Sequence, residues 1–249
     1  MRNLIYMAIL LLLGACQKEE VFLYDEAKSS IQFNYADAEI VLDYNFAMQY
    51  KIVEIDMGWG VQEDRFYYGD SLRRDTIPLV LSVLGLKDEN ERPFKLKTVL
   101  VKGQDSTKIA DVEFLPSYSF QANSLKDTIQ IVLLRPAERG EYTIGITFDV
   151  EGEEAPFALG AEEKSIYRLN ISDRYRKPAS WDGMAELYLG EYSEEKYAFI
   201  VTLRGKLDIL FWECWLYNQD LRDALDAYNM AHPDSPKDFT FPVNTTPPW

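Results

Sequence analysis

Short segments rich in β-branched and aromatic residues recur between residues 30 and 172, and they constrain the fold more than any other feature. Apolar and polar residues alternate within several of them, as expected for strands with one buried face. Turn-forming residues separate the segments, which is typical of β-sandwiches. The sequence therefore predicts a mainly β, immunoglobulin-like β-sandwich over residues 30–172, with strands at Ser30–Tyr35, Thr76–Gly85, Lys95–Val101, Thr128–Arg135, Tyr142–Val150 and Ser165–Ser172.

A smaller α+β region is predicted for residues 173–249. A connector containing Tyr, Pro, Ser and Gly opens it, and we expect burial of Trp181 to anchor this connector. Ser193 is a candidate cap for a short helix, and Asp220–Ala231 carries the clearest helical pattern. The segment Leu207–Tyr217 fits either a buried strand or a helix. A proline-rich tail follows.

Charge and composition exclude several classes of function. The 249 residues include 26 Lys and Arg against 41 Asp and Glu, a net charge of −15 that repels phosphate backbones and argues against nucleic-acid binding. The single histidine, His232, excludes a multi-histidine metal site. Cys214 lies among aromatic residues, which suits a buried structural thiol. We expect no metal and no cofactor.

The first residues have the organisation of an export signal. Arg2 precedes the apolar stretch Leu4–Leu13, whose length fits the hydrophobic region of a secretory signal peptide. The run Leu13-Gly14-Ala15-Cys16 then resembles the bacterial lipobox, whose cysteine is acylated and becomes the new N-terminus. The resemblance implies a signal peptide over residues 1–15, a lipid anchor on Cys16 and a tether over residues 16–29. The alternatives are an ordinary signal peptide with an incidental cysteine, or a single-span anchor.

A short charged run follows the cysteine. Lys18, Glu19 and Glu20 resemble the export signal of Bacteroidetes surface lipoproteins, a lysine followed by two acidic residues close to the lipidated cysteine. The resemblance implies a lipid-anchored protein of the outer membrane that is exposed on the cell surface. The alternative is a plain solvated tether, which is the usual role of a charged run.

An aromatic-rich segment, Asp56–Asp70, offers candidate binding residues. It contains Trp59, Phe66, Tyr67 and Tyr68 among glycines and polar residues. Aromatic side chains on a flexible loop are able to stack on sugar rings or to dock a partner protein. The alternative is that they turn inward and plug one end of the sandwich, because aromatic side chains are usually buried.

The search for catalytic residues finds no recognisable set. The carboxylate pairs Glu63/Asp64 and Glu153/Glu154 are adjacent in sequence, whereas a glycosidase needs two carboxylates that flank one bond. The acidic stretch Glu151–Lys164 lacks the spacing of known calcium loops. His232 precedes a proline at the predicted end of a helix, where the helix dipole favours a histidine. We therefore predict a protein without a catalytic site.

The layout resembles a family of uncharacterised Bacteroidetes lipoproteins that are grouped as a domain of unknown function. The matching features are the lipobox at Cys16, the segment around Tyr24 and Ile31-Gln32-Phe33, and the stretches DTIPLVLSVLG, GEYTIGITF and KPASWDGMAELYLGEYSEEKYAFI. The last stretch is the most specific. Genes of this family often neighbour those of starch-utilisation-type outer-membrane uptake systems, so the resemblance implies a location and a neighbourhood.

These observations lead to one expected function and one alternative. We expect a non-catalytic, surface-exposed outer-membrane lipoprotein that serves as an accessory binding component of a nutrient uptake system. Its partners would be the membrane, through the lipid, and a glycan, a peptide, or a transporter or lipoprotein of the complex. The alternative is a degradative hydrolase of the same locus that works through carboxylates.

Overall fold

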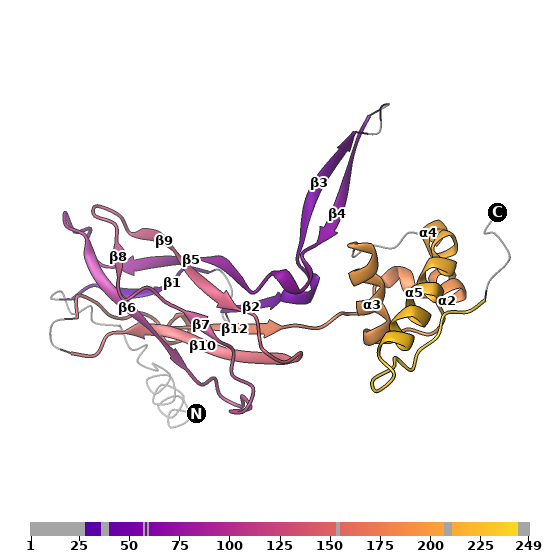
Figure 1. The fold of residues 1–249 in the computed structure, drawn as a ribbon. Helices are drawn as coiled ribbons and strands as arrows, with labels where there is room; N and C mark the ends of the chain where they lie inside the picture. Colours follow the sequence, from indigo (N-terminus) through magenta and orange to yellow (C-terminus); the bar gives the residue numbers. More distant parts are fainter. Residues whose placement is uncertain are drawn as a thin grey trace, which may run out of the picture.

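The computed structural model describes residues 28–35, 40–56, 58, 60–152, 155–206 and 211–243. Strands occupy the chain up to residue 172 and α-helices follow, so the predicted mainly β class is confirmed (Figure 1). The strands are β1 (Ser30–Phe33), β2 (Ile40–Asn45), β3 (Tyr50–Asp56), β4 (Val61–Tyr67), β5 (Arg74–Leu84), β6 (Arg92–Val99), β7 (Val112–Glu113), β8 (Tyr118–Phe120), β9 (Lys126–Leu134), β10 (Glu141–Asp149), β11 (Ala158–Leu159) and β12 (Ile166–Ser172). The helices are α2 (Met184–Leu189), α3 (Glu194–Arg204), α4 (Phe211–Leu216) and α5 (Asn218–Ala231).

Two five-stranded sheets form the larger unit. One sheet has the order β11-β1-β5-β9-β7 and the other has the order β2-β12-β10-β6-β8. Most neighbouring strands are antiparallel, but β1 pairs with β11 and β2 pairs with β12 in parallel. The strand segments expected from the sequence correspond to β1, β5, β6, β9, β10 and β12, with their ends shifted by a few residues.

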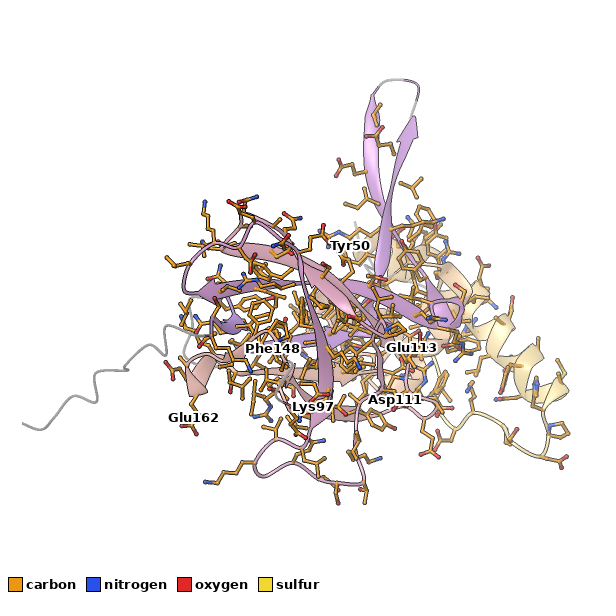
Figure 2. The ribbon with its side chains drawn as sticks, turned by 90° about the vertical axis from the view of Figure 1, so that its left-hand side faces the viewer. Tyr50, Lys97, Asp111, Glu113, Phe148 and Glu162 are labelled. Carbon is orange, nitrogen blue, oxygen red and sulfur yellow. The ribbon has the colours of Figure 1, made fainter. Side chains whose placement is uncertain are left out.

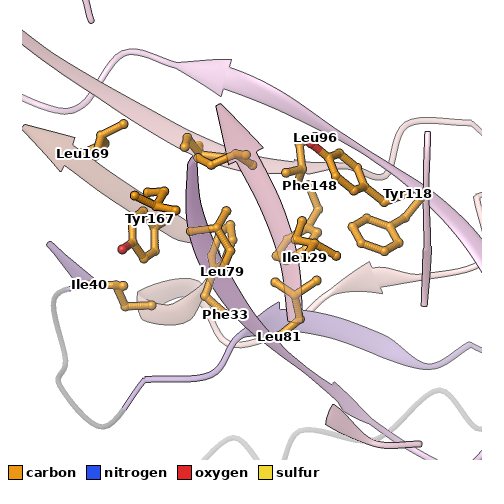
Figure 3. Close-up of a cluster of buried hydrophobic side chains, with 14 of the residues drawn as sticks. Phe33, Ile40, Leu79, Leu81, Leu96, Tyr118, Ile129, Phe148, Tyr167 and Leu169 are labelled. Carbon is orange, nitrogen blue, oxygen red and sulfur yellow. The ribbon is translucent and has the colours of Figure 1, made fainter. Parts of the chain in front are cut away.

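Alternation along the strands builds one core between the two sheets. In β9, Ile129, Ile131 and Leu133 are buried, while Thr128 and Gln130, on either side of Ile129, are exposed. The rings of Phe33 from one sheet and Phe148 from the other are 4.6 Å apart, so the inner faces meet directly (Figure 3). Fully burying each such side chain contributes roughly 1.5–3 kcal/mol, which makes this core the main source of stability for the sheets.

In its described part the C-terminal region consists of helices, without the strands that the predicted α+β character implies. Within residues 173–206 and 211–243 the structure has helices and no strand, apart from a single bridge between Lys206 and Phe66. The segment that fitted either a strand or a helix contributes α4. An aromatic-rich apolar run with no partner strand nearby forms its hydrogen bonds locally, and this favours the helix.

The predicted helix signals are largely confirmed. The Ser193 side chain accepts a hydrogen bond of 3.1 Å from the Lys196 backbone N–H and caps α3. Helix α5 ends at Ala231, directly before His232 as expected, but it begins at Asn218, two residues before the predicted start at Asp220. The indole of buried Trp181 donates to the Gly190 carbonyl at 3.1 Å, which anchors the connector.

The helices enclose a second, separate core. Its buried members include Trp181, Tyr197, Val201, Cys214 and Leu221. Burial raises the pKa of the Cys214 thiol to about 12, and the neighbouring Glu213 carboxylate adds to this effect. Cys214 is therefore a buried, unreactive thiol as predicted. No helix within the described ranges is both long and apolar enough to cross a membrane.

The aromatic segment belongs to a β-hairpin and is not a flexible loop. Strands β3 and β4 form a two-stranded sheet of their own that projects away from the rest of the molecule (Figure 1). Tyr50 pairs with Tyr67 at its base and Asp56 pairs with Val61 at its far end. The pattern of β3 was not recognisable because Lys51, Glu54 and Asp56 interrupt its apolar residues. The apolar residues of β2 are contiguous and show no alternation.

Candidate ligand groove between the sheets and the helices

A buried ion pair joins the sheets to the connector that leads to the helices. Arg135 follows β9 and Asp173 follows β12, and both are buried. The guanidinium donates to the carboxylate through Nε at 3.0 Å and through Nη2 at 2.8 Å, and Nη1 donates to the Gly69 carbonyl at 2.7 Å. Such a bidentate pair fixes direction as well as distance. The chain therefore leaves the sheets in a defined orientation.

The base of the hairpin is attached to the helices. The Tyr67 backbone N–H donates to the Gly205 carbonyl at 2.9 Å, just beyond the end of α3. The hydroxyl groups of Tyr67 and Tyr175 are hydrogen-bonded, and their rings are 5.7 Å apart. Burial raises the pKa of the Tyr67 phenol, and the nearby Asp70 carboxylate adds to this effect. The sheets, the hairpin and the helices thus converge on one junction.

A groove of about 1010 Å³ lies at this junction. One wall comes from the sheets through Asp70 and Arg139, and the opposite wall comes from α3 and α5. Arg174 and Tyr175 of the connector line the groove between the two walls. Grooves of this size between packed units are common ligand sites, so this is the strongest candidate site in the described part of the chain.

The charged side chains of the groove are held in ion pairs. Arg174 donates to Oε2 of Glu194 through Nε at 3.1 Å and through Nη2 at 2.9 Å. Lys237 Nζ lies 2.7 Å from Oε1 of Glu195. Arg139 Nη2 lies 3.5 Å from Oδ1 of Asp70, and its guanidinium lies over the Tyr175 ring at 5.0 Å. These pairs leave both signs of charge at the rim, where they can exchange partners with a polar ligand.

The apolar part of the groove comes mainly from one face of α3. Ala198, Phe199, Thr202 and Leu203 line it, and they recur at the spacing of a single helix face. Leu203 is 47% exposed, so part of this apolar surface is open to a ligand. Phe199 is held from behind by Phe239, with ring centroids 5.7 Å apart. The groove therefore combines a rigid apolar floor with a charged rim.

Three of the four predicted aromatic residues, Phe66, Tyr67 and Tyr68, lie at the base of the hairpin and do not line the groove. Phe66 and Tyr67 are half-buried at the base of the hairpin, and Tyr68 is 40% exposed. None of these three occurs among the described side chains that line the groove, and none plugs an end of the two-sheet unit. The remaining predicted site residues, Leu13, Gly14, Ala15, Cys16, Lys18, Glu19, Glu20 and Trp59, lie outside the described residues.

The other residues considered for chemistry are dispersed. Glu63 is exposed on β4, while Glu153 and Glu154 lie outside the described residues. His232 ends α5 and stacks on the Tyr228 ring at 4.2 Å, as expected for a helix-terminal histidine. Within the described ranges there is no cluster of three or more His, Cys, Asp or Glu side chains that could hold a metal ion.

Sequence reasoning missed the groove residues Arg139, Arg174 and Lys237. They are widely separated along the chain, and no motif links them to Asp70, Glu194 or Glu195. One partial signal existed, because Glu194 and Glu195 follow the predicted helix cap at Ser193 and so had to lie in the first turn of a helix. The partners of these carboxylates depend on tertiary structure.

The solved structures that resemble this chain do so only weakly. The apo form of the Calx CBD1 domain is 10% identical over 59% of this chain and 97% of that chain, with a TM-score of 0.35. A Bacteroides ovatus GH5 xyloglucanase in complex with a XXXG heptasaccharide is 12% identical over 60% of this chain and 20% of that chain, with a TM-score of 0.27. The N-terminal domain of PorA is 9% identical over 59% and 96%, with a TM-score of 0.21. Because these TM-scores are low, nothing is inferred from the three structures.

The family comparison is more informative. No curated protein matches the chain. Residues 64–206, more than half of the 249, match the family described as "Domain of unknown function (DUF4843)". The matched range runs from β4 through both sheets to the end of α3, so it includes most of the residues that form the junction. The chain belongs to the DUF4843 family.

Proposed function

We propose that this protein is a non-catalytic accessory component of a nutrient uptake system, which binds a glycan or a peptide in the groove between the sheets and the helices. The observation that carries the proposal is the groove itself, with its apolar floor on α3 and its rim of paired charges. An apolar floor provides contact area, and charged groups at the rim provide directional contacts to a polar ligand.

The pairing of the rim charges favours binding over hydrolysis. A general acid or base must exchange protons, whereas Glu194 and Glu195 are engaged by Arg174 and Lys237. Both oxygens of Glu194 already accept hydrogen bonds, one from the Arg174 guanidinium and the other from the Tyr175 backbone N–H. The alternative function, a carboxylate-based hydrolase, would require one of these pairs to open.

The location is part of the same proposal. The lipobox ending in Cys16 supports a lipid anchor, and Lys18, Glu19 and Glu20 support transport to the outer face of the outer membrane of a member of the Bacteroidetes. The acyl chains of such a residue hold a protein on the membrane because each buried CH2 contributes about 0.8 kcal/mol.

The proposal also includes an immunoglobulin-like arrangement of residues 30–172, which is supported by two five-stranded sheets around one core.

Binding of a ligand panel tests the proposal. The purified protein is titrated with fluorescent oligosaccharides and peptides, and the same titration is made with Leu203→Glu, which places a charge on the groove floor. Leu216→Glu is the matched control, because Leu216 is 50% exposed on α4 and does not line the groove. We expect saturable binding of at least one ligand class that Leu203→Glu abolishes and Leu216→Glu leaves intact.

Two outcomes would count against the proposal. Equal binding by the wild type and Leu203→Glu would show that the groove is not the site. Hydrolysis of any ligand that is lost in Glu194→Gln or Glu195→Gln would instead support the hydrolase.

A further inference from the structure

The β3–β4 hairpin is a projecting arm with little support from the rest of the protein. Figures 1 and 2 show it extending beyond both the sheets and the helices. Within the described residues its two strands pair only with each other, apart from the bridge between Phe66 and Lys206 and the Tyr67–Gly205 hydrogen bond at the base. A two-stranded hairpin on its own is only marginally stable in water.

One face of the arm is apolar and acidic. Alternation and register place Tyr50, Ile52 and Glu54 of β3 on the same face as Val61, Glu63 and Arg65 of β4. Ile52 is 59% exposed and Val61 is 67% exposed. The Arg65 guanidinium lies over the Tyr50 ring at 5.0 Å, toward the base. The face thus presents two solvated aliphatic side chains with glutamates between them.

The two glutamates are placed directly against each other. Glu54 and Glu63 are register partners across the hairpin, and neither forms an ion pair with a described residue. Like charges that face each other across two strands destabilise the pairing of those strands. Residues 54–64 contain four carboxylates, from Glu54, Asp56, Glu63 and Asp64, and no Lys or Arg. The outer part of the arm therefore has no cation of its own in its sequence, and a partner could supply one.

The outer edge of β3 is also available. Within the described ranges no strand pairs with that side of Tyr50–Asp56, so its backbone donors and acceptors face solvent. An exposed edge of this kind accepts an added strand from another protein. Addition of a third strand would give the arm the support that two strands lack.

We propose that the β3–β4 arm docks a partner protein, which adds an extended strand along β3 and places Lys or Arg side chains over Glu54 and Glu63. Ile52 and Val61 would pack against apolar side chains that flank the cationic ones. A second copy of this chain does not fit, because it would bring four glutamates together in place of two. An anionic lipid surface does not fit either, because these carboxylates repel it. The proposal does not depend on the groove.

Titration with short peptides tests the docking. The purified full-length protein is titrated with a fluorescent seven-residue peptide, Val-Thr-Val-Thr-Lys-Thr-Lys, which has the length of β3 and carries Val and Lys on one face (the Lys–Val peptide). A second titration uses the same peptide with Glu in place of Lys (the Glu–Val peptide). Vesicles containing phosphatidylglycerol form a third probe. The variant Glu54→Gln/Glu63→Gln removes the opposed charges. Glu162→Gln/Glu163→Gln is the matched control, because it makes the same change of charge at exposed residues far from the arm (Figure 2).

We expect the Lys–Val peptide to bind and the Glu–Val peptide not to bind. The Glu54→Gln/Glu63→Gln variant should bind the Lys–Val peptide about tenfold more weakly, equivalent to about 1.4 kcal/mol, and the control variant should bind it as the wild type does. Leu203→Glu should leave this binding unchanged, which separates the arm from the groove.

Three results would overturn the docking proposal. Equal weakening by both double variants would mean that the peptide responds only to the net charge of −15. Equal binding of both peptides would mean that the glutamates are not recognised. Vesicle binding that requires Ile52 and Val61, without peptide binding, would identify the arm as a membrane contact.

Discussion

At the scale of single residues, the ion pair between Arg135 and Asp173 holds the parts of the junction together. Their side chains are almost completely inaccessible, with 1% and 6% of their surface exposed. The pair closes the space between the end of β9 and the end of β12, and it also ties down the loop at Gly69. The net stabilisation by a buried ion pair is small, because both charges lose their hydration. Removal of one partner is nevertheless strongly destabilising, because the other charge stays buried.

Arg135→Ala is therefore expected to destabilise the protein by about 3 kcal/mol, because the buried Asp173 carboxylate loses both of its short contacts and keeps only the Arg139 guanidinium at 3.7 Å. Urea denaturation followed by circular dichroism measures this difference. Arg74→Ala is the control, since the Arg74–Glu113 pair is largely exposed and its loss should cost less than about 1 kcal/mol. Similar losses in both variants would contradict the structural role assigned to Arg135.

At the scale of elements, the sequence predicted the strands that bury one clean apolar face and missed those that do not. β9 and β6 show regular alternation of buried and exposed residues, so their pattern could be recognised locally. β3 and β4 bury neither face in the body of the protein, and their charged residues made them look like a loop. The groove could not be predicted either, because its walls come from residues as far apart as Asp70 and Lys237.

The cap of α3 yields a prediction at this scale. Ser193→Ala removes the acceptor for the Lys196 N–H at the start of the helix that forms the groove floor, and we expect a loss of about 1 kcal/mol of stability. Thermal denaturation measures it. Ser106→Ala, in an exposed turn between β6 and β7, should leave the melting temperature unchanged. An unchanged melting temperature for Ser193→Ala would show that α3 is held by packing alone.

At the scale of the whole molecule, the proposed anchor and export signal give separable outcomes. Cys16→Ser should abolish labelling of the protein by radioactive palmitate, because it removes the acylated thiol. Replacing Lys18, Glu19 and Glu20 by alanine should preserve the lipid but remove access of added protease to the protein on whole cells. If the alanine variant stays accessible to protease, the export signal is misassigned. Labelling of Cys16→Ser would exclude the lipobox.

The strand order separates Ser30, the first residue of β1, from the groove. Ser30 pairs with Leu84 at one end of β5, whereas Arg74 at the other end lies beside the junction. With the lipid on Cys16 as proposed, the long axis of the sheets would act as a spacer between the bilayer and the ligand. The eleven residues of β5 span about 37 Å, at roughly 3.4 Å per residue. The groove and the arm would then lie tens of ångströms above the lipid surface. At that height the nearest surfaces would be neighbouring protein complexes and not lipid headgroups.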